Sequence, residues 1–423
     1  MQHDSPSKSG RPFALGFKEF VALIAALMAM NALSIDPMLP ALPAIGESLN
    51  IADANARQCI ITSYFLGLGF GSLIYGPLSD RFGRKPVLVV SLSLFLIATT
   101  FCALSQSFPM MLGGRFACGF FAAASRVIAI SIVRDRFQGD RMARIMSLIF
   151  IVFMIVPILA PSFGQAVLLI APWRWIFGAL LIVGLVIMIW MMIRLPETLD
   201  PENRVSIRAS DLKETLGRVV THRSALGYMM ATGVVMGGLV GFITSVQQIF
   251  FDVFDREAIF PVAFACIAGC MAVGSFLNSH LVERIGARRL SQGSLIALMS
   301  VSGVHAIYSW AGLETFASFF VFQALTMLCF AFTGSNFGAI SMEPFARGAG
   351  MASSFQASLT TTISALLGAF VGSQFDGTTL PLALGFFGFG VLAFLLVAWA
   401  ERGRLFTRPG LSSLRKGASI PPR

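Results

Sequence analysis

The sequence has 423 residues, of which 56% are hydrophobic and only 12% are charged, and its mean hydropathy is +0.78. A soluble domain carries about 25% charged residues, so this composition excludes an ordinary soluble protein and indicates one that crosses a membrane. At roughly 20 apolar residues per span, the chain has room for about twelve transmembrane helices.

The net charge of +10 would suit a nucleic-acid partner, but the distribution of the charge argues against one. Most lysines and arginines fall in the two tails and in alternate loops, which is the pattern of the positive-inside rule. We therefore predict that both termini are cytoplasmic, that no nucleic acid binds, and that the lipid bilayer surrounds the protein. We expect a monomer.

Apolar runs predict two groups of six helices around a charged linker. The first run has no small-residue cleavage site after it, so we expect it to be retained as a helix. The predicted fold is an all-α polytopic membrane protein with twelve transmembrane helices in two pseudo-symmetric bundles. After a cytoplasmic tail at 1–19, the first bundle covers 20–195, with predicted helices at 20–43, 58–78, 86–105, 109–132, 144–169 and 174–194. A cytoplasmic linker follows at 196–224 and contains a short amphipathic helix at 210–220. The second bundle covers 225–400, with predicted helices at 225–247, 259–281, 290–310, 314–337, 347–372 and 379–400, and a basic cytoplasmic tail follows at 401–423.

One loop sequence occurs twice and supports a duplication. The run Asp80-Arg81-Phe82-Gly83-Arg84-Lys85 follows the second predicted helix, and Glu283-Arg284-Ile285-Gly286-Ala287-Arg288 follows the eighth. Both runs have the order acid, base, any residue, glycine, any residue, base. In transporters built from parallel repeats, substrate sites lie near the bilayer midplane between the halves.

The sequence offers no pattern for a metal, a cofactor or an enzyme. The six cysteines lack a metal-ligand spacing, and Cys266 with Cys270 fits two small packing residues on one helix. Neither a nucleotide-binding glycine loop nor a catalytic triad is present. We therefore predict no cofactor, no bound metal and no enzymatic activity.

Three charged residues lie well inside predicted spans. Burying a charge in a membrane costs several kcal/mol of free energy, so such residues are candidates for a functional role. They are Asp36 in the first helix and Arg115 and Arg126 in the fourth. Asp36 lies about 10 Å and Arg115 about 9 Å from the predicted outer ends, so the two are level and could pair. Burial disfavours the charged carboxylate and a nearby arginine favours it, which suits proton coupling. Alternatively, Asp36 caps the helix break made by Pro37 and Pro40.

Other polar residues within the spans are candidates to line a substrate cavity, because an amide that faces lipid lacks a partner. Arg126 is one candidate, although its side chain could instead reach the cytoplasmic interface. A bridge between helices is the alternative for the others. The predicted substrate-binding residues are Asp36, Tyr64, Arg115, Arg126, Gln165, Tyr228 and Asn336.

The first charged loop, together with the glycine before it, resembles the signature loop between the second and third helices of the major facilitator superfamily of secondary transporters. The resemblance implies a conformational latch that engages the N-terminus of helix 11. The matching residues are Gly76, Asp80, Arg81, Gly83, Arg84 and Lys85.

Two further segments resemble signatures of this superfamily. Arg115 and Gly119 match its helix 4 signature, whose arginine is implicated in proton transfer. Pro157, Pro161 and Gly164 are similar to the helix 5 signature of its antiporters. Here the chain departs from the pattern at Ala160 and Gln165, where glycines are usual, and this weakens the inference of antiport.

Most of the chain resembles the twelve-helix drug:proton antiporters of the bicyclomycin-resistance (Bcr/CflA) branch, most densely in the first half. The resemblance implies export of drug-like small molecules in exchange for protons across a bacterial inner membrane. The alternative is a proton-coupled or facilitative carrier for a nutrient or metabolite. The segments that carry the resemblance are 36–43, 134–135, 173–177, 196–198 and 350–354.

Overall fold

The computed structural model describes residues 15–137, 139–204, 216–345 and 349–407. All regular elements in these ranges are helical, and twelve of them are at least 17 residues long. The long helices are α1 (Phe17–Leu33), α3 (Cys59–Phe82), α4 (Arg84–Ala103), α5 (Phe108–Arg136), α6 (Gly139–Ile170), α7 (Arg174–Arg194), α9 (Arg223–Gln248), α10 (Phe260–Ile285), α11 (Ala287–Trp310), α12 (Phe316–Met342), α13 (Ala349–Ser373) and α14 (Leu380–Ala400).

The short elements are a break in the first span and four connections. Because proline lacks the N–H that a helix interior needs, Pro37 and Pro40 end the α-helical pattern after α1. The chain continues as a tighter turn and a short helix, so the single helix predicted over 20–43 is in fact three segments. The short elements are η1 (Asp36–Ala41), α2 (Leu42–Ser48), η2 (Asn55–Gln58), η3 (Pro201–Asn203), η4 (Ile249–Val253) and η5 (Glu257–Ile259).

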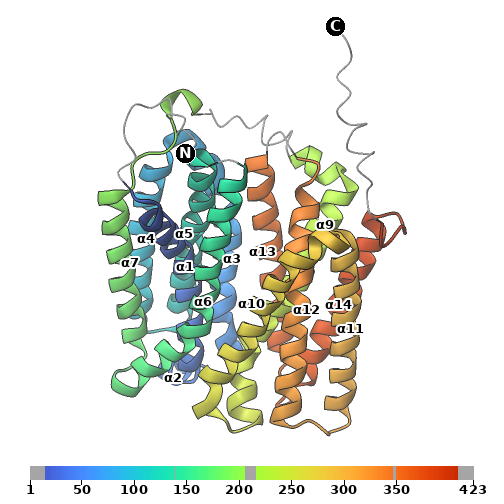
Figure 1. The fold of residues 1–423 in the computed structure, drawn as a ribbon. Helices are drawn as coiled ribbons and strands as arrows, with labels where there is room; N and C mark the ends of the chain where they lie inside the picture. The colour runs from blue at the N-terminus through green and yellow to red at the C-terminus, as the bar shows by residue number, and fades with distance from the viewer. Residues whose placement is uncertain (1–14, 138, 205–215, 346–348, 408–423) are drawn as a thin grey trace.

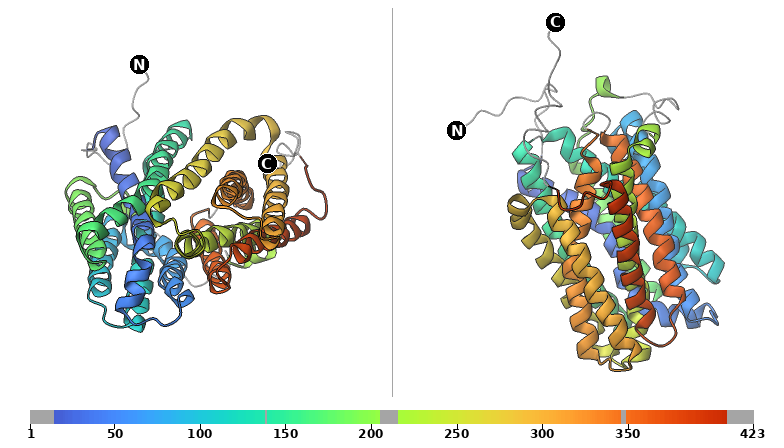
Figure 2. Two further views of the ribbon diagram at one scale, coloured as in Figure 1. Left: turned by 90° about the horizontal axis from the view of Figure 1, so that it is seen from below. Right: turned by 90° about the vertical axis from the view of Figure 1, so that its right-hand side faces the viewer.

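The helices α1 to α7 form one group and α9 to α14 form a second group beside it (Figure 1). The view from below shows the same two groups side by side (Figure 2). Most of the amphipathic helix predicted over 210–220 lies outside the described residues.

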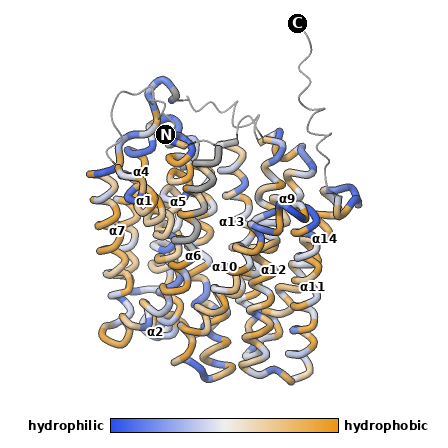
Figure 3. The backbone as a smooth tube through the Cα atoms, viewed as in Figure 1, coloured by the Kyte–Doolittle hydropathy of each residue, from blue (hydrophilic) through white to orange (hydrophobic). Residues whose placement is uncertain are grey.

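The composition of the helices suits a membrane. In the described residues, eleven stretches are long and apolar enough to cross one, and the described apolar part of α6 is Ile155–Ile170. Hydrophobic residues fill the middle of the helices, and hydrophilic residues gather at their ends (Figure 3). The predicted all-α polytopic fold is therefore confirmed.

The molecule has two ends. We call the end that holds Gly83, Glu197 and Glu401 the linker end, and the end that holds Asn55 and Ser373 the far end. In Figure 1 the linker end is at the top.

The apolar cores of the two groups merge only toward the far end. The largest core cluster contains residues of α1 to α7 and continues into Phe250, Phe260 and Phe319 of the second group. Two other clusters contain only residues of the second group, around Tyr228 and around Met229. The helices α6 and α10 accordingly diverge toward the linker end (Figure 1).

Candidate functional site

Arg115 is fully buried in α5, and its charge has no acidic partner in the described residues. Its guanidinium carbon lies 4.5 Å from the centroid of the Tyr64 ring. Its Nε donates to the carbonyl oxygen of Ile60 at 3.4 Å, whereas Nη1 and Nη2 have no hydrogen-bond partner. A cation over an aromatic face is stabilised by the ring quadrupole. Two strong donors nevertheless remain unsatisfied.

Close packing of α3 against α5 brings Tyr64 to Arg115. At Gly119 an added Cβ would overlap the carbonyl group of Tyr64, and at Gly67 it would overlap that of Phe116. Only glycine permits this approach of two helix backbones. Gly119 of the helix 4 signature therefore positions the ring that lies against Arg115.

Asp36 is the first residue of η1 and is 5% exposed. It forms no ion pair with Arg115, although both residues are described. It does not cap the helix break either, because the N-cap of η1 is Ile35 and no side-chain cap is present. The carboxyl group is therefore buried and forms neither an ion pair nor a cap with the described residues.

Asn31 is a member of this site that the sequence reasoning missed. Its Oδ1 accepts a hydrogen bond from the Tyr64 hydroxyl at 3.2 Å, and its Nδ2 is buried without a partner. The available signal was an amide in an apolar run five residues before Asp36. We call Asn31, Asp36, Tyr64 and Arg115 the Arg115 cluster.

The helix 5 signature positions α6 against the break that carries Asp36. An added Cβ at Gly164 would overlap the carbonyl oxygen of Pro37. The adjacent Gln165 is half-buried, Pro161 is buried, and Pro157 lies inside the same helix. Gln165 therefore directly follows the residue of α6 that packs against Pro37, the neighbour of Asp36 in the sequence.

Arg126 is exposed on the same face of α5 as Arg115. Eleven residues separate the two arginines, which at 3.6 residues per turn leaves them about 20° apart around the helix. On this face of α5, the side chain of Arg115 is therefore buried, whereas that of Arg126, which lies nearer the linker end, is exposed.

Tyr228 and Asn336 lie in other polar contacts. The Tyr228 hydroxyl donates to Glu401 at 2.9 Å and accepts from Gln292 at 3.1 Å. The Nδ2 of Asn336 donates to Oδ1 of Asn278 at 2.6 Å and so bridges α12 to α10. The structure does not bring Tyr228 or Asn336 to the Arg115 cluster.

Arg84 is the centre of a charge network at the linker end. It is 3% exposed, and its Nη1 lies 2.5 Å from Asp80 while its Nε lies 2.9 Å from Asp135 of α5. Among the three cations of the loop, Arg84 is thus the one that Asp80 contacts. Arg81 is exposed and lies over the Phe82 ring. The network ties α3, α4 and α5 together.

Glu197, after α7, completes this network. Gly83 has φ +99°, a conformation that favours glycine, and it turns the chain into α4. The carboxylate of Glu197 accepts from the backbone N–H groups of Arg84 at 3.0 Å and Lys85 at 3.1 Å. Lys85 Nζ donates to the carbonyl oxygen of Met192 at 2.8 Å. An acid at a helix N-terminus is stabilised by the helix dipole.

The predicted latch partner is α13, and Gly76 is the residue of the loop signature that reaches it. An added Cβ at Gly76 would overlap the hydroxyl of Ser354 in α13. Gly69 packs in the same way against Thr362. The glycines of α3 therefore carry a contact between the two groups of helices.

The second charged loop resembles the first, although its paired arginine, Arg288, aligns with Lys85 and not with Arg84. Gly286 has φ +92°, and Arg288 contacts Glu343 at 2.7 Å and Glu401 at 2.8 Å. Glu343 directly follows α12 and Asp135 lies in the last turn of α5, while Glu401 follows α14 as Glu197 follows α7. This correspondence supports the duplication that the repeated loop predicts.

The duplication also relates Arg115 to Gln323. Arg115 is the eighth residue of α5 and Gln323 the eighth of α12. Gln323 is fully buried, and both of its amide atoms lack a hydrogen-bond partner.

Three amides join the two groups at the far end, and the sequence reasoning did not find them. Asn55 Nδ2 donates to the carbonyl oxygens of Phe375 at 2.9 Å and Ser373 at 3.3 Å. Gln248 Nε2 donates to Asn55 at 3.1 Å, and Gln58 Nε2 donates to Gln248. We call Asn55, Gln58 and Gln248 the far-end amides.

Together, two groups of six long helices, a repeated charged loop and buried charges inside the spans define a secondary transporter of the twelve-helix class. The family model described as Major Facilitator Superfamily matches residues 21–369. The chain belongs to the major facilitator superfamily. The family predicted from its loop, helix 4 and helix 5 signatures is thus confirmed.

Several curated relatives are similar to the chain. A Bicyclomycin resistance protein homolog of Haemophilus influenzae is 28% identical over 86% of this chain and 91% of its own length. The Multidrug resistance protein MdtL of Escherichia coli is 27% identical over 78% of this chain and 82% of its own length. The Uncharacterized MFS-type transporter YdgK of Bacillus subtilis is 32% identical over 62% of this chain and 65% of its own length.

Two solved structures share the fold at low sequence identity. The human organic anion transporter MFSD10 superimposes with a TM-score of 0.70 at 17% identity, covering 89% of this chain and 98% of that one. A D-xylose-proton symporter superimposes with a TM-score of 0.68 at 13% identity, covering 89% of this chain and 97% of that one.

Proposed function

We propose that the protein exports drug-like small molecules in exchange for protons by alternating access. The observation that carries this proposal is the Arg115 cluster. A buried carboxyl group without an ion pair and a buried guanidinium with two unsatisfied donors lie in the first group of helices. Such groups are costly inside a membrane and indicate a functional site. The names of the relatives, bicyclomycin resistance and multidrug resistance, support export of this substrate class.

The mechanism starts from the charge of Arg115. Nη1 and Nη2 of Arg115 can donate to the substrate, and a deprotonated Asp36 can accept from it, so the two charged side chains together hold the substrate. A proton that Asp36 takes up from the outside removes this acceptor, weakens its hold on Arg115 and releases the substrate, and a new substrate that binds from the inside favours loss of the proton. Proton and substrate then bind in alternate states, which is the requirement for exchange.

The orientation follows from charge. The linker end carries the two charged loops with Arg402 and Arg404, and the positive-inside rule supports a cytoplasmic location for it, with the protein in a bacterial inner membrane. In this orientation the far-end amides close the outer side. With this orientation, the divergence of α6 from α10 lies on the cytoplasmic side and supports a state that is closed toward the outside (Figure 1).

The departures of α6 from the antiporter pattern favour one alternative, a proton-coupled or facilitative carrier of a nutrient or metabolite. Ala160 and Gln165 occupy positions where the antiporter signature has glycines. With one carboxyl and an arginine at cavity depth, the proposed exporter accepts neutral, zwitterionic or weakly anionic compounds better than dications.

The test uses inside-out proteoliposomes with an acidic lumen and a pH-sensitive dye. A panel of phenicols, bicyclomycin-like compounds, sulfonamides, sugars and amino acids is added, and proton efflux is recorded. Exchange predicts efflux triggered by an antibiotic and lost in Asp36→Asn, while Asp376→Asn, an exposed acid at the far end, serves as the control. Efflux that survives in Asp36→Asn overturns the coupling role of Asp36. A response to sugars or amino acids alone, or uptake without proton movement, establishes the carrier instead.

A further inference from the structure

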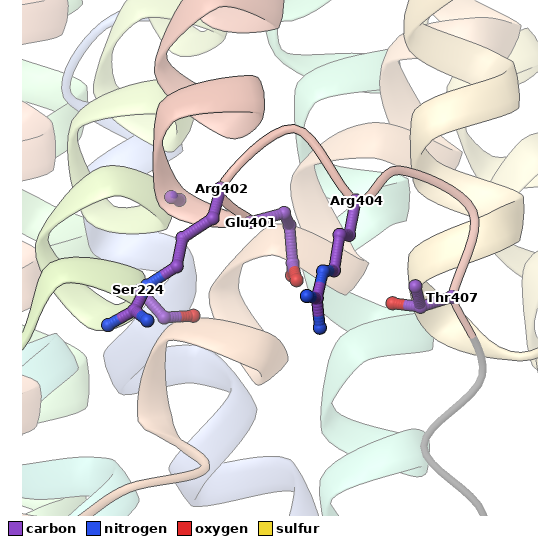
Figure 4. A pocket seen from close by; sticks show the side chains of 6 residues that line it. Ser224, Glu401, Arg402, Arg404 and Thr407 are labelled. Atoms are coloured by element: carbon purple, nitrogen blue, oxygen red, sulfur yellow. The ribbon is translucent and has the colours of Figure 1, made fainter.

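A pocket outside the Arg115 cluster lies at the linker end of the second group. It is formed where α14 ends at Ala400 and α9 begins at Arg223, so it lies at the ends of two membrane-crossing helices. Figure 4 shows the side chains that line it. The lining residues are Ser224, Ala400, Glu401, Arg402, Arg404 and Thr407.

The pocket presents two arginines that are not neutralised. Arg402 and Arg404 are both exposed, and neither forms an ion pair with a described residue. The acid in the wall, Glu401, is already engaged: its Oε1 accepts from Arg288 at 2.8 Å and from the Tyr228 hydroxyl at 2.9 Å. The guanidinium groups of Arg402 and Arg404 project to the same side of the loop (Figure 4). The guanidinium group of Arg402 lies next to Ser224. The accessible charge of the pocket is therefore positive.

The remaining donors suit an anion with several oxygens. Ser224 is the second residue of α9, so the positive end of the α9 dipole lies at the pocket. The hydroxyl groups of Ser224 and Thr407 can each donate one hydrogen bond. A guanidinium presents a planar fork of donors that matches the oxygens of a phosphate group. Two such forks, two hydroxyls and a helix N-terminus together fit phosphate chemistry.

The residues around the pocket indicate which molecule supplies the phosphate group. Trp399, one residue before the pocket, is 44% exposed, and Phe406 on the other side is 40% exposed. The Arg223 guanidinium lies 5.0 Å from the Trp399 ring and its Nε donates to the Trp399 carbonyl at 2.7 Å. Exposed aromatic rings at the ends of spans lie at the level of the lipid headgroups. Basic pockets at that level attract anionic lipids.

We propose that this pocket binds a phosphate group through Arg402 and Arg404, and that the headgroup of an anionic phospholipid supplies it. The bound lipid links the end of α14 to the start of α9 in addition to the Arg223–Trp399 contact. The site is separate from the Arg115 cluster and does not depend on which substrate is transported.

The experiment measures binding of phosphatidylglycerol with a fluorescent acyl chain to the purified full-length protein in a neutral detergent. The test variant is Arg402→Gln with Arg404→Gln. The control variant is Lys18→Gln with Arg204→Gln, which removes two exposed cations at the same end of the first group and changes the net charge equally. Thermal unfolding of each variant verifies the fold.

We expect about tenfold weaker binding of phosphatidylglycerol to the test variant and less than about twofold weaker binding to the control. Zwitterionic phosphatidylethanolamine with the same label should bind the wild type more weakly than phosphatidylglycerol. Equal losses in the two variants, or equal binding of the two lipids, overturn the proposal.

A second arm distinguishes the source of the phosphate. Inorganic phosphate is added to the wild type and the test variant, and its binding is followed by phosphorus NMR, with chloride at matched ionic strength as the control. Millimolar or weaker binding, alongside tight lipid binding, assigns the site to the lipid headgroup. Tight binding of inorganic phosphate that is lost in the test variant and excludes the lipid probe assigns the site to free phosphate and overturns the lipid as its source.

Discussion

The guanidinium of Arg115 lies over the ring of Tyr64, 4.5 Å from its centroid, and forms no ion pair with Asp36. The ring stabilises a charge that would otherwise be buried at high cost, but it leaves the strong donors Nη1 and Nη2 free. A salt bridge at this place would commit both charges. The aromatic contact instead holds Arg115 in a conformation from which it can bind a carboxylate or a substrate oxygen.

This contact predicts different effects of two substitutions at Tyr64. Tyr64→Leu removes the ring and should lower substrate-driven proton flux about tenfold, because a desolvated cation–π contact contributes roughly 1 to 2 kcal/mol. Tyr64→Phe keeps the ring and loses only the hydrogen bond to Asn31, so we expect a loss below about threefold. Flux in proteoliposomes measures both, with Tyr308→Leu in α11 as the control. Equal losses in the two Tyr64 variants would show that the hydroxyl matters and the ring does not.

The contact of α6 with η1 predicts a strong effect at Gly164. A methyl group there would overlap the backbone carbonyl of Pro37, which has no rotamer to move to. Gly164→Ala should therefore cost about 1 to 3 kcal/mol of stability and reduce transport. Gly269→Ala in α10 is the matched control, because nothing lies within 4 Å of its added Cβ, and alanine favours a helix. Thermal unfolding in detergent checks both, and similar midpoints for the two variants would contradict the prediction.

The sequence was sufficient for the all-α fold, because the periodicity of the apolar residues locates the helices. That Asp36 and Arg115 lie at one level stays a prediction from residue counts. Counting along a helix does not say which side chain of the next helix fills the space beside Arg115. That depends on the close approach of α3 and α5 at Gly119 and Gly67, and this approach brings Tyr64 to the arginine.

For Tyr228 as well, the sequence does not identify the residue that the side chain contacts. Its polar hydroxyl inside an apolar span predicts a partner, but the partner, Glu401, follows 173 residues later in the chain. Only the packing of α9 against α14 brings the two together. Two of the far-end amides, Asn55 and Gln58, have no signal in the sequence, because they lie in a polar loop where such residues are common.

The charge network around Arg84 predicts that Arg84 and Asp135 are energetically coupled. Arg84→Gln leaves two carboxylates near each other without their cation and should cost about 2 to 3 kcal/mol of stability. Asp135→Asn should cost less in the Arg84→Gln background than in the wild type, with a coupling energy of about 1 to 2 kcal/mol. Arg81→Gln removes an exposed cation of the same loop and should have little effect. Additive effects of the Arg84 and Asp135 substitutions would show that the contact does not stabilise the protein.

The far-end amides predict a closure that is independent of charge. Gln248 lies between Gln58 and Asn55, so Gln248→Ala removes hydrogen bonds to both residues. At about 1 kcal/mol for each neutral bond, this should favour the state open at the far end by roughly ten- to thirtyfold. Gln374→Ala is the control, because this exposed amide at the same end donates only to its neighbour Ser373.

Spin labels at the exposed positions Glu47 and Thr378, on opposite groups, measure the opening of the far end. The six native cysteines, none in a disulfide, are first replaced so that only the two introduced cysteines react. We expect Gln248→Ala to move the distance distribution to longer values and Gln374→Ala to leave it as in the wild type. The shift should persist from pH 6 to pH 8, because no amide of this closure titrates. A distribution that Gln248→Ala leaves unchanged would mean that the apolar core shared by the two groups holds the far end closed without the amides.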